Sequence, residues 1–399
     1  MRITTANSFS AAVDNLQQRQ QELQLAQDRL TSGKRVARAS DDPAAAARVE
    51  RSLATSARAV ADQRGLQASR SAMQQVEGAL GGATEVLQQV RELLLAAGNG
   101  SYTDTERANI GLRILGQREQ LLAIANRGDS ALGYLFGGQG SAQPPFIDGT
   151  GGVSFRGAEG QAEVQAGDLL PMTHDGAAAW LGARSGNGVF VTTPAATNGT
   201  GAWIDSGSVS DPSALTGDDY RIDFSVAAGV TTWSVLKNGA ATAMVNLPYV
   251  SGQAMQFDGM AVTVNGAPAD GDRFEITPSA PDLSLFDVLD RIAAELQAGG
   301  RSRAQVAQTV ASGLRDIDSA FGNLQMQRAL AGESLNRIDA VEGRLAETTL
   351  SAQTERSLAE DLDMVQAVSD FQTKQSGYNA ALSTYSMVQR MSLFDYLNG

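Results

Sequence analysis

The side chains best suited to acid–base or nucleophilic chemistry lie in one glycine-rich stretch near the middle of the chain. His174 is the single histidine, Asp175 follows it directly, and Ser185 comes shortly after. Serine, histidine and aspartate side chains in hydrogen-bond contact would form a hydrolytic triad. A histidine in the sequence Met172-Thr173-His174-Asp175-Gly176 is nevertheless more typical of a surface turn. We therefore predict an exposed His174 and assign no catalytic residue.

Three further motifs suggest phosphate or metal binding, but their spacing argues against it. Ser185-Gly186-Asn187-Gly188 has the glycines of a phosphate-binding loop without the Lys-Ser/Thr pair that follows one. Gly217-Asp218-Asp219 and Asp270-Gly271-Asp272 lack the alternating ligands and the final glutamate of an EF-hand loop. Asp-Gly pairs favour the backbone of hairpin turns. We predict a turn between strands at the first motif, hairpin turns at the other two, and no metal or cofactor.

The overall composition excludes several classes of protein. The 399 residues contain no cysteine, which excludes disulfides, thiolate nucleophiles and Cys/His zinc sites. The 44 acidic and 31 basic residues give a net charge of -13, which repels nucleic acid and anionic lipid. The first ten residues contain no apolar signal-peptide core, and no 18 apolar residues run together. We expect no nucleic-acid partner, no membrane partner, no cleaved signal and no membrane span.

Composition changes sharply between residues 137 and 283. This segment holds 23 of the 42 glycines and nine of the ten prolines, and its 15 acidic and 5 basic residues give a net charge of -10. Short alternating runs that are typical of half-buried strands occur at 220–224, 232–235 and 273–276. The flanks are rich in the helix formers Ala, Leu, Gln, Arg and Glu. We predict a mainly α protein with an inserted β-sandwich-like domain.

Capping signals place the first helices. A glycine at Gly33 interrupts the N-terminal helix. Asp42 fits the N-cap position of the next helix, with Pro43 at N1, where its missing N–H costs nothing. That helix continues to about residue 98. Thr103 and Glu106 then have the spacing of a capping box, which predicts a third helix to about residue 128.

The chain returns to helix after the insertion. Pro281-Asp282-Leu283 predicts the start of a helix over about 285–298. Gly299-Gly300 ends it, and the pattern predicts one further helix from about residue 301 to the end of the chain.

These elements divide the chain into three parts. We predict terminal coiled-coil helices for polymerisation over 1–42 and 350–399, a helical bundle over 43–136 and 284–349, and a β-rich outer domain over 137–283. If the two flanks pack on each other, the middle is an insertion in a helical bundle. The helix predicted after Pro43 is longer than a typical globular helix, which indicates an elongated bundle.

Apolar residues recur at heptad-like spacing at both ends of the chain. They recur every seven residues from Phe9 to Leu30, and in steps of four and three from Met364 to Tyr385, in a series that also includes the polar residues Gln375 and Gln389. Such stripes are more often core within one chain than an assembly surface. Here, however, they lie where a monomer usually frays, and the final residues are apolar for a free end. We predict self-assembly and partner contacts at Phe9, Leu16, Leu23, Leu30, Val368, Phe371, Leu382, Tyr385, Leu393, Phe394 and Tyr396.

Four groups of segments carry a family resemblance. They are Arg29 to Val36 with Ser40 to Pro43, Gly133 to Gly138 with Pro144 to Phe146, Gly217 to Ile222 with Gly271 to Phe274, and Asp361 to Met364 with Ser392 to Leu397. Through them the flanks, about 1–140 and 285–399, resemble the flagellin-like axial proteins of bacterial flagella. The second, third and fourth groups are similar to segments of the hook-associated members of that family. Flagellins usually lack Pro43, which ends the first group. The outer segment is longer than a minimal member needs.

The resemblance implies a mechanical role and no enzyme. It implies an inner coiled-coil layer of terminal helices, and export in a largely unfolded state through the flagellar type III apparatus with a chaperone bound to the C-terminal helix. The expected location is secreted and extracellular, at the junction of hook and filament. There copies of the chain would form a ring between hook-associated protein 1 and flagellin.

Two alternatives stay open at this point. A filament flagellin with an expanded outer domain would share the terminal helices, and the pattern over 393–397 argues against it. A glycan-binding or hydrolytic module on a helical stalk would use the acidic β segment as its active part. No convergent site for that module is visible in the sequence.

Overall fold

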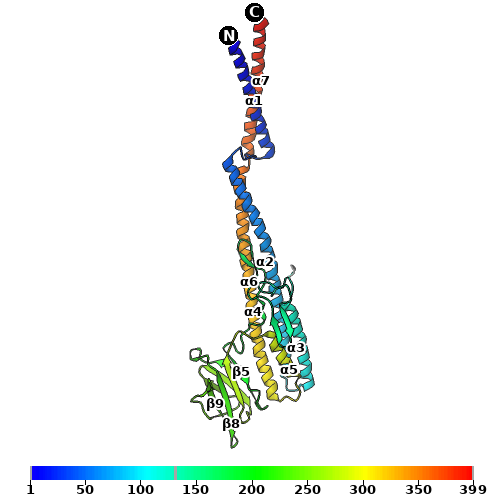
Figure 1. The fold of residues 1–399 in the computed structure, drawn as a ribbon, viewed down its shortest axis with the longest axis vertical. Coiled ribbons are helices and arrows are strands. Elements are labelled where there is room, and N and C mark those ends of the chain that lie inside the picture. The colour runs from blue at the N-terminus through cyan, green and yellow to red at the C-terminus, as the bar shows by residue number, and fades with distance from the viewer. Residues whose placement is uncertain (1, 130–132, 398–399) are drawn as a thin grey trace. The chain divides into compact units, whose positions relative to one another are not determined.

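The computed structural model describes residues 2–129 and 133–397, and the side chains of residues 2–9 and 388–397 lie outside this description. The chain forms two compact units, one from residues 1–64 with 342–399 and the other from residues 65–341. Helices α2 (Pro43–Ala97) and α6 (Arg303–Glu360) pass through both units (Figure 1). Helical flanks around an inserted β domain confirm the predicted fold class. The three-part division of the chain stays a proposal.

The first unit contains the two terminal helices. α1 (Arg2–Ser32) and α7 (Met364–Leu397) pack side by side in antiparallel directions, so both chain ends lie together (Figure 1). Gly377 of α7 faces α1, because a Cβ added there would lie 2.9 Å from the Arg19 guanidinium. The terminal helices are therefore partners within one chain.

The capping predictions for the first helices are confirmed. One Asp42 carboxylate oxygen accepts hydrogen bonds from the amides of Ala44 and Ala45 at 3.1 and 3.0 Å, and α2 begins at Pro43. Thr103 and Glu106 form the reciprocal capping box that opens α3 (Asp104–Ala125). These local signals work because each satisfies amides that a helix start leaves unpaired.

The prediction of one helix from about residue 301 to the chain end is wrong. α6 ends at Glu360, and α7 begins at Met364. The Asp363 carboxylate accepts hydrogen bonds from the amides of Val365 and Gln366 at 3.0 and 3.2 Å, which makes it the N-cap of a new helix. The sequence from Leu358 to Gln366 contains no glycine or proline, so the usual helix-breaking residues do not mark the break.

The helical part of the second unit has a leucine-rich core. Buried residues of α2 recur every seven positions, at Leu66, Met73, Leu80, Leu87 and Leu94. α3 packs against α5 (Leu285–Gln297). The Arg118 guanidinium of α3 holds Asp148 at 2.5 and 2.9 Å and Asp290 of α5 at 2.7 Å. Because the Arg118 side chain is buried and these bonds are charge-assisted, they tie the start of the insertion to two helices.

The first part of the insertion lies on this helical core. It contains the hairpins β1 (Phe146–Gly149) with β2 (Gly152–Phe155) and β3 (Glu163–Gln165) with β4 (Leu169–Pro171), followed by the short helix α4 (Gly176–Trp180). Trp180 stacks on Phe286 of α5 with ring centroids 5.9 Å apart, and Phe136 meets Trp180 edge-on at 5.4 Å. This aromatic cluster buries the base of the insertion against the helices.

The second part of the insertion is a two-sheet β-sandwich, which we call the sandwich. One sheet has the order β10-β9-β8-β14-β5, with β11 also paired to β9; the other has the order β12-β13-β6, with β7 paired to β13. The strands of the first sheet are β5 (Phe190–Pro194), β8 (Tyr220–Ala227), β9 (Val230–Lys237), β10 (Ala240–Ala241), β11 (Leu247–Pro248) and β14 (Arg273–Pro278). Those of the second are β6 (Ala202–Ile204), β7 (Ser208–Val209), β12 (Ala254–Phe257) and β13 (Met260–Gly266).

The sandwich core follows from alternation along its strands. In β8 the residues Tyr220, Ile222 and Phe224 are buried, while the residues between them are half-buried. Phe274 of β14 packs edge-on against Phe224 at 5.8 Å, and Val262 of β13 joins the same core from the other sheet. Period-2 burial on facing sheets is the arrangement that a sandwich requires.

The hairpin turns of the sandwich lie at other positions than predicted. Ala228-Gly229, Asn238-Gly239 and Asp258-Gly259 carry positive φ at both residues, as type I′ turns need. Gly217-Asp218-Asp219 is an irregular segment before β8, and Asp270-Gly271 turns the chain from β13 of one sheet to β14 of the other. A dipeptide signal thus marks a turn but does not specify which strands the turn joins. Ser185-Gly186-Asn187-Gly188 is a turn, but it connects α4 to β5 and so does not lie between two strands.

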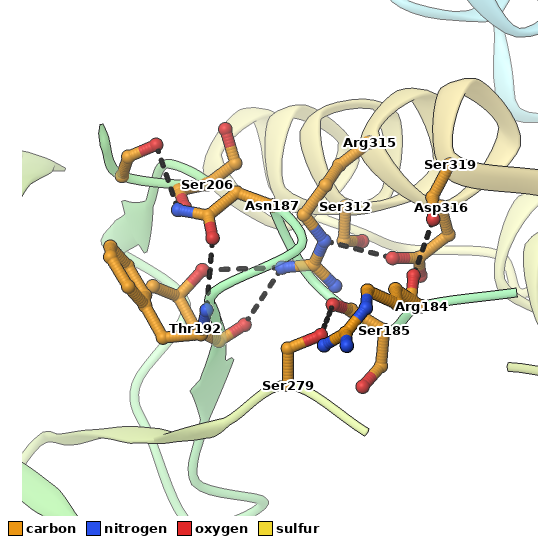
Figure 2. Close-up of polar contacts among 12 residues, drawn as sticks. Arg184, Ser185, Asn187, Thr192, Ser206, Ser279, Ser312, Arg315, Asp316 and Ser319 are labelled. Carbon is orange, nitrogen blue, oxygen red and sulfur yellow. Dashed lines mark hydrogen bonds and ion pairs between the residues drawn. The ribbon is translucent and has the colours of Figure 1, made fainter. Parts of the chain in front are cut away.

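Two linker segments run side by side where the chain enters and leaves the sandwich. The Ser185 amide donates to the Ala280 carbonyl at 2.9 Å, and the Ser279 hydroxyl donates to the Ser185 carbonyl at 2.6 Å. Figure 2 shows the adjacent contact, in which Arg315 of α6 donates to the Thr192 carbonyl and hydroxyl oxygens at 3.1 and 3.2 Å. Interfaces built from such polar contacts are typical of domains within one chain that fold separately.

We predict that the sandwich can be removed without unfolding the helices. Replacing residues 190–278 by two glycines joins ends that already meet, since the Ser279 amide donates to the Val189 carbonyl at 3.0 Å. The expected result is an unchanged helical circular dichroism signal and an unchanged thermal midpoint for the helical unfolding transition. Loss of most of the helical signal would contradict this prediction and would show that the sandwich holds the helices together.

Candidate assembly interface

The structure does not assemble a catalytic site around His174, and the prediction of an exposed histidine is wrong. The His174 side chain is 1% exposed and meets the Phe136 ring edge-on at 6.2 Å. Its Nε2–H donates to the Gln327 Oε1 atom at 2.9 Å, while the Gln161 amide donates to Nδ1 at 3.4 Å. These two amides fit the neutral imidazole, so His174 is a hydrogen-bonded core residue that connects the insertion to α6.

Burial lowers the pKa of His174, more than the Gln327 contact and the Asp175 charge raise it. The unfolded chain therefore takes up the proton first as pH falls below about 6.5, and acid favours unfolding. We predict that stability decreases between pH 7 and the lower folded pKa with a slope of at most about 1.4 kcal/mol per pH unit from this group. Urea midpoints measured across this range for the wild type and for His174→Gln test this. Equal pH dependence in both would contradict it.

Metal-ligand groups and membrane-spanning helices were sought among the described residues. No group of three or more His, Asp or Glu side chains within residues 2–129 and 133–397 is arranged to hold a metal ion. No described helix is both long and apolar enough to cross a bilayer. The sequence analysis predicts contacts with other proteins on the terminal helices.

The residues predicted for that surface divide between two faces. Leu16, Leu23 and Leu30 of α1 are half-buried, as are Phe371 and Tyr385 of α7. Since α1 and α7 pack against each other, we interpret these five as the seam inside one chain. The heptad spacing alone does not separate this seam from a surface for other molecules.

The other face of α7 leaves apolar side chains in water. Leu382 is 41% exposed and Val368 is likewise exposed. Three residues that the sequence analysis did not single out for contacts are more open, with Val365 at 85%, Met387 at 66% and Met364 at 50%. These residues lie along the part of α7 that α1 leaves uncovered, and apolar surface left exposed in a single chain marks an interaction surface. We call Val365, Val368, Leu382 and Met387 the assembly face.

Four of the predicted contact residues cannot be placed on either face. Phe9 lies in α1, and Leu393, Phe394 and Tyr396 lie in α7. Their side chains are outside the described residues. Their predicted contacts stay predictions.

A joint connects the terminal helices to α2 and α6 within the first unit. The Arg35 amide donates to the Glu360 carbonyl at 2.7 Å, and its guanidinium donates to the Ala359 carbonyl at 2.7 Å and lies 3.3 Å from the Asp42 carboxylate. Leu362 donates its amide to the Gly33 carbonyl at 3.0 Å. Arg35 thus satisfies carbonyl groups at the end of α6 and the cap of α2 together.

Electrostatics stabilise the same joint. Hydrogen bonds from the Ala45 amide and from the Arg35 guanidinium hold the pKa of Asp42 below its usual value. Lys34 forms an ion pair with Glu360. The sequence analysis read Asp42 as a cap but missed Arg35, because its carbonyl partner lies at the far end of the chain.

Family models match both flanks and most of the sandwich. The bacterial flagellin N-terminal helical region matches residues 3–140, and the bacterial flagellin C-terminal helical region matches residues 314–397. The D2-like domain of flagellar hook-associated protein 1 matches residues 193–278, which are almost the whole sandwich. The terminal helices, the joint and the assembly face all lie within the two flagellin regions.

Curated relatives carry a more specific name. Flagellar hook-associated protein 3 of Salmonella typhimurium is 31% identical over 182 residues, which are 44% of this chain and 56% of that protein. The matched stretch therefore spans only about half the length of that relative. Flagellar hook-associated protein 3 of Escherichia coli is 23% identical over 407 residues, which are 99% of each chain.

Solved structures agree with these relatives. The flagellar junction protein FlgL of Legionella pneumophila is 28% identical with a TM-score of 0.65, covering 70% of this chain and 94% of that one. FlgL of Xanthomonas campestris is 27% identical with a TM-score of 0.67, covering 77% and 99%. The chain therefore carries the two terminal helical regions of the bacterial flagellins, and along its length it resembles flagellar hook-associated protein 3.

Proposed function

We propose that this protein is a structural component of the bacterial flagellum that joins the hook to the flagellin filament. The observation that carries the proposal is the assembly face, because a helix of a flagellin-type terminal region leaves Val365 and Leu382 exposed in the single chain. Burying these side chains against neighbouring molecules removes apolar surface from water, which favours polymerisation. The role is mechanical, without turnover of a substrate.

The partners of the junction follow from its position in a linear structure. One end of the ring contacts hook-associated protein 1, the other contacts flagellin, and the sides contact further copies of this chain. Each copy is exported through the flagellar type III apparatus and reaches the junction outside the cell. A chaperone bound to α7 before export would cover the assembly face, which otherwise invites aggregation in the cytoplasm.

Deletion of the gene tests this function. We expect electron micrographs to show hooks without filaments, together with abundant unpolymerised flagellin in the medium, because export continues while the junction is missing. Restoring the gene on a plasmid should restore filaments. Bare hooks without secreted flagellin would point to a filament subunit instead, and intact filaments would overturn the flagellar junction role.

A further inference from the structure

In the first unit, the contact between α2 and α6 is made by small side chains. Buried positions recur every seven residues along α2. In this segment they hold the small residues Ala45, Ser52 and Ala59, whereas further along α2 they hold leucine or methionine. The buried positions of α6 that face this segment hold Ala352 and Ala359. Alanine and serine bury little apolar area, so this segment gains less from packing than the leucine seam does. A helix pair of this composition leaves room for another element beside it.

A groove of about 720 Å³ lies along this seam. Its walls come from α2 at Arg48, Arg51, Ser52 and Thr55, and from α6 between Glu347 and Ala359. The Ser52 residue is 4% exposed, and its Oγ atom has no hydrogen-bond partner among the described residues. A buried hydroxyl without a partner costs free energy, which a polar group entering the groove would recover. At the rim, Leu358 is 80% exposed.

The two walls of the groove carry opposite charge. Residues 43–64 of α2 hold four basic and two acidic side chains, a net of +2, and residues 342–360 of α6 hold two basic and four acidic side chains, a net of -2. Within the described residues, no ion pair joins Arg48 or Arg51 to any carboxylate, or Glu347 or Glu355 to any base. Four charged side chains thus face the groove without a salt-bridge partner.

We infer that this groove is a lateral contact for a second copy of the same chain. A neighbour that places its basic α2 wall against the acidic α6 wall of the first copy matches the charges of both, and the first copy's α2 wall stays free for the next neighbour. Such a heterologous contact repeats from one copy to the next, as a ring of copies requires. The contact covers Leu358 of the first copy, and it brings acidic side chains of that copy's α6 beside the neighbour's Ser52, whose hydroxyl then gains a polar partner. The inference rests on the proposed function, which requires many copies side by side.

Cross-linking in assembled flagella tests the contact, and the absence of natural cysteines makes it specific. Arg51→Cys and Glu355→Cys are made as separate single variants and co-expressed in the gene-deletion strain, so no disulfide can form within one chain. Flagella are then treated with a short bis-maleimide. We expect a cross-linked product of twice the chain mass, at least tenfold above that from Ala57→Cys with Gln353→Cys. The latter two residues are exposed and do not line the groove.

The outcomes distinguish a failure of the lateral contact from a failure of the proposed junction function. Filaments must first be present with both variants, which shows that the junction itself has formed. A dimer product no stronger than that of the control pair in such flagella would overturn the lateral contact and leave the junction role intact. A product of another mass from Arg51→Cys would also overturn it, because the groove would then bind a different junction protein.

Discussion

Cells that carry Leu382→Asp in place of the native chain are expected to lose at least nine-tenths of their filaments and to release flagellin into the medium. Leu382 is 41% exposed in the single chain, so water solvates the new carboxylate and the monomer keeps its fold. We propose that neighbouring molecules cover this position in the assembled junction, where an unpaired buried charge costs several kcal/mol per contact. Swimming motility and electron microscopy measure the outcome.

Two control variants make this result specific. Leu382→Met keeps an apolar side chain of similar volume and should restore filaments. Asn379→Asp adds the same charge one turn earlier at a position that is already polar and exposed, and it should cost little. Normal motility of the Leu382→Asp strain would contradict the role of the assembly face. An equal loss with Asn379→Asp would show that net charge, rather than apolar contact, controls incorporation.

Local sequence signals predicted the helix starts correctly because their partners are close in the chain. Asp42 and Thr103 bond to amides within the next three residues, so the sequence alone contains the whole interaction. The alternating run from Tyr220 likewise predicts its strand, since burial alternates with the same period. Secondary structure of this kind can be predicted from the sequence without knowledge of tertiary contacts.

Features that depend on distant partners were not predictable in this way. The break between α6 and α7 places the Leu362 amide on the Gly33 carbonyl, more than three hundred residues away in the chain. His174 is buried because Phe136 and Gln327 cover it, and neither is its neighbour in sequence. Local composition favoured a surface turn for His174, and tertiary packing overrode it.

The contact surface was predicted as a set but not resolved into faces. Phe371 and Leu382 belong to the same apolar stripe, although Phe371 is half-buried and Leu382 is exposed. A stripe with heptad spacing has two flanks, and only the position of α1 decides which flank is covered. The same limit explains why Val365 was overlooked, because it lies off the stripe and on the open side of α7.

The sandwich core gives the largest expected stability effect. Phe274 is 0% exposed, and β14 lies between β8 and β5, so the ring is enclosed by both neighbouring strands and by the second sheet. Truncating a buried phenylalanine removes its transfer free energy and leaves a cavity, which costs about 3–5 kcal/mol. That is a large fraction of the roughly 5–15 kcal/mol that stabilises a typical domain. Phe274→Ala should therefore unfold the sandwich at much lower urea concentration.

Hydrogen exchange shows whether this loss stays within the sandwich. Peptides from residues 190–278 should lose protection in Phe274→Ala, while peptides around Leu80 and Leu87 of α2 keep theirs, because polar contacts such as Arg315 with Thr192 couple the two parts weakly. Val230→Ala, at an exposed hairpin position, should change neither set. An equal loss of protection in α2 would mean that sandwich and helices unfold as one unit. The removal of residues 190–278 would then be expected to unfold the helices as well.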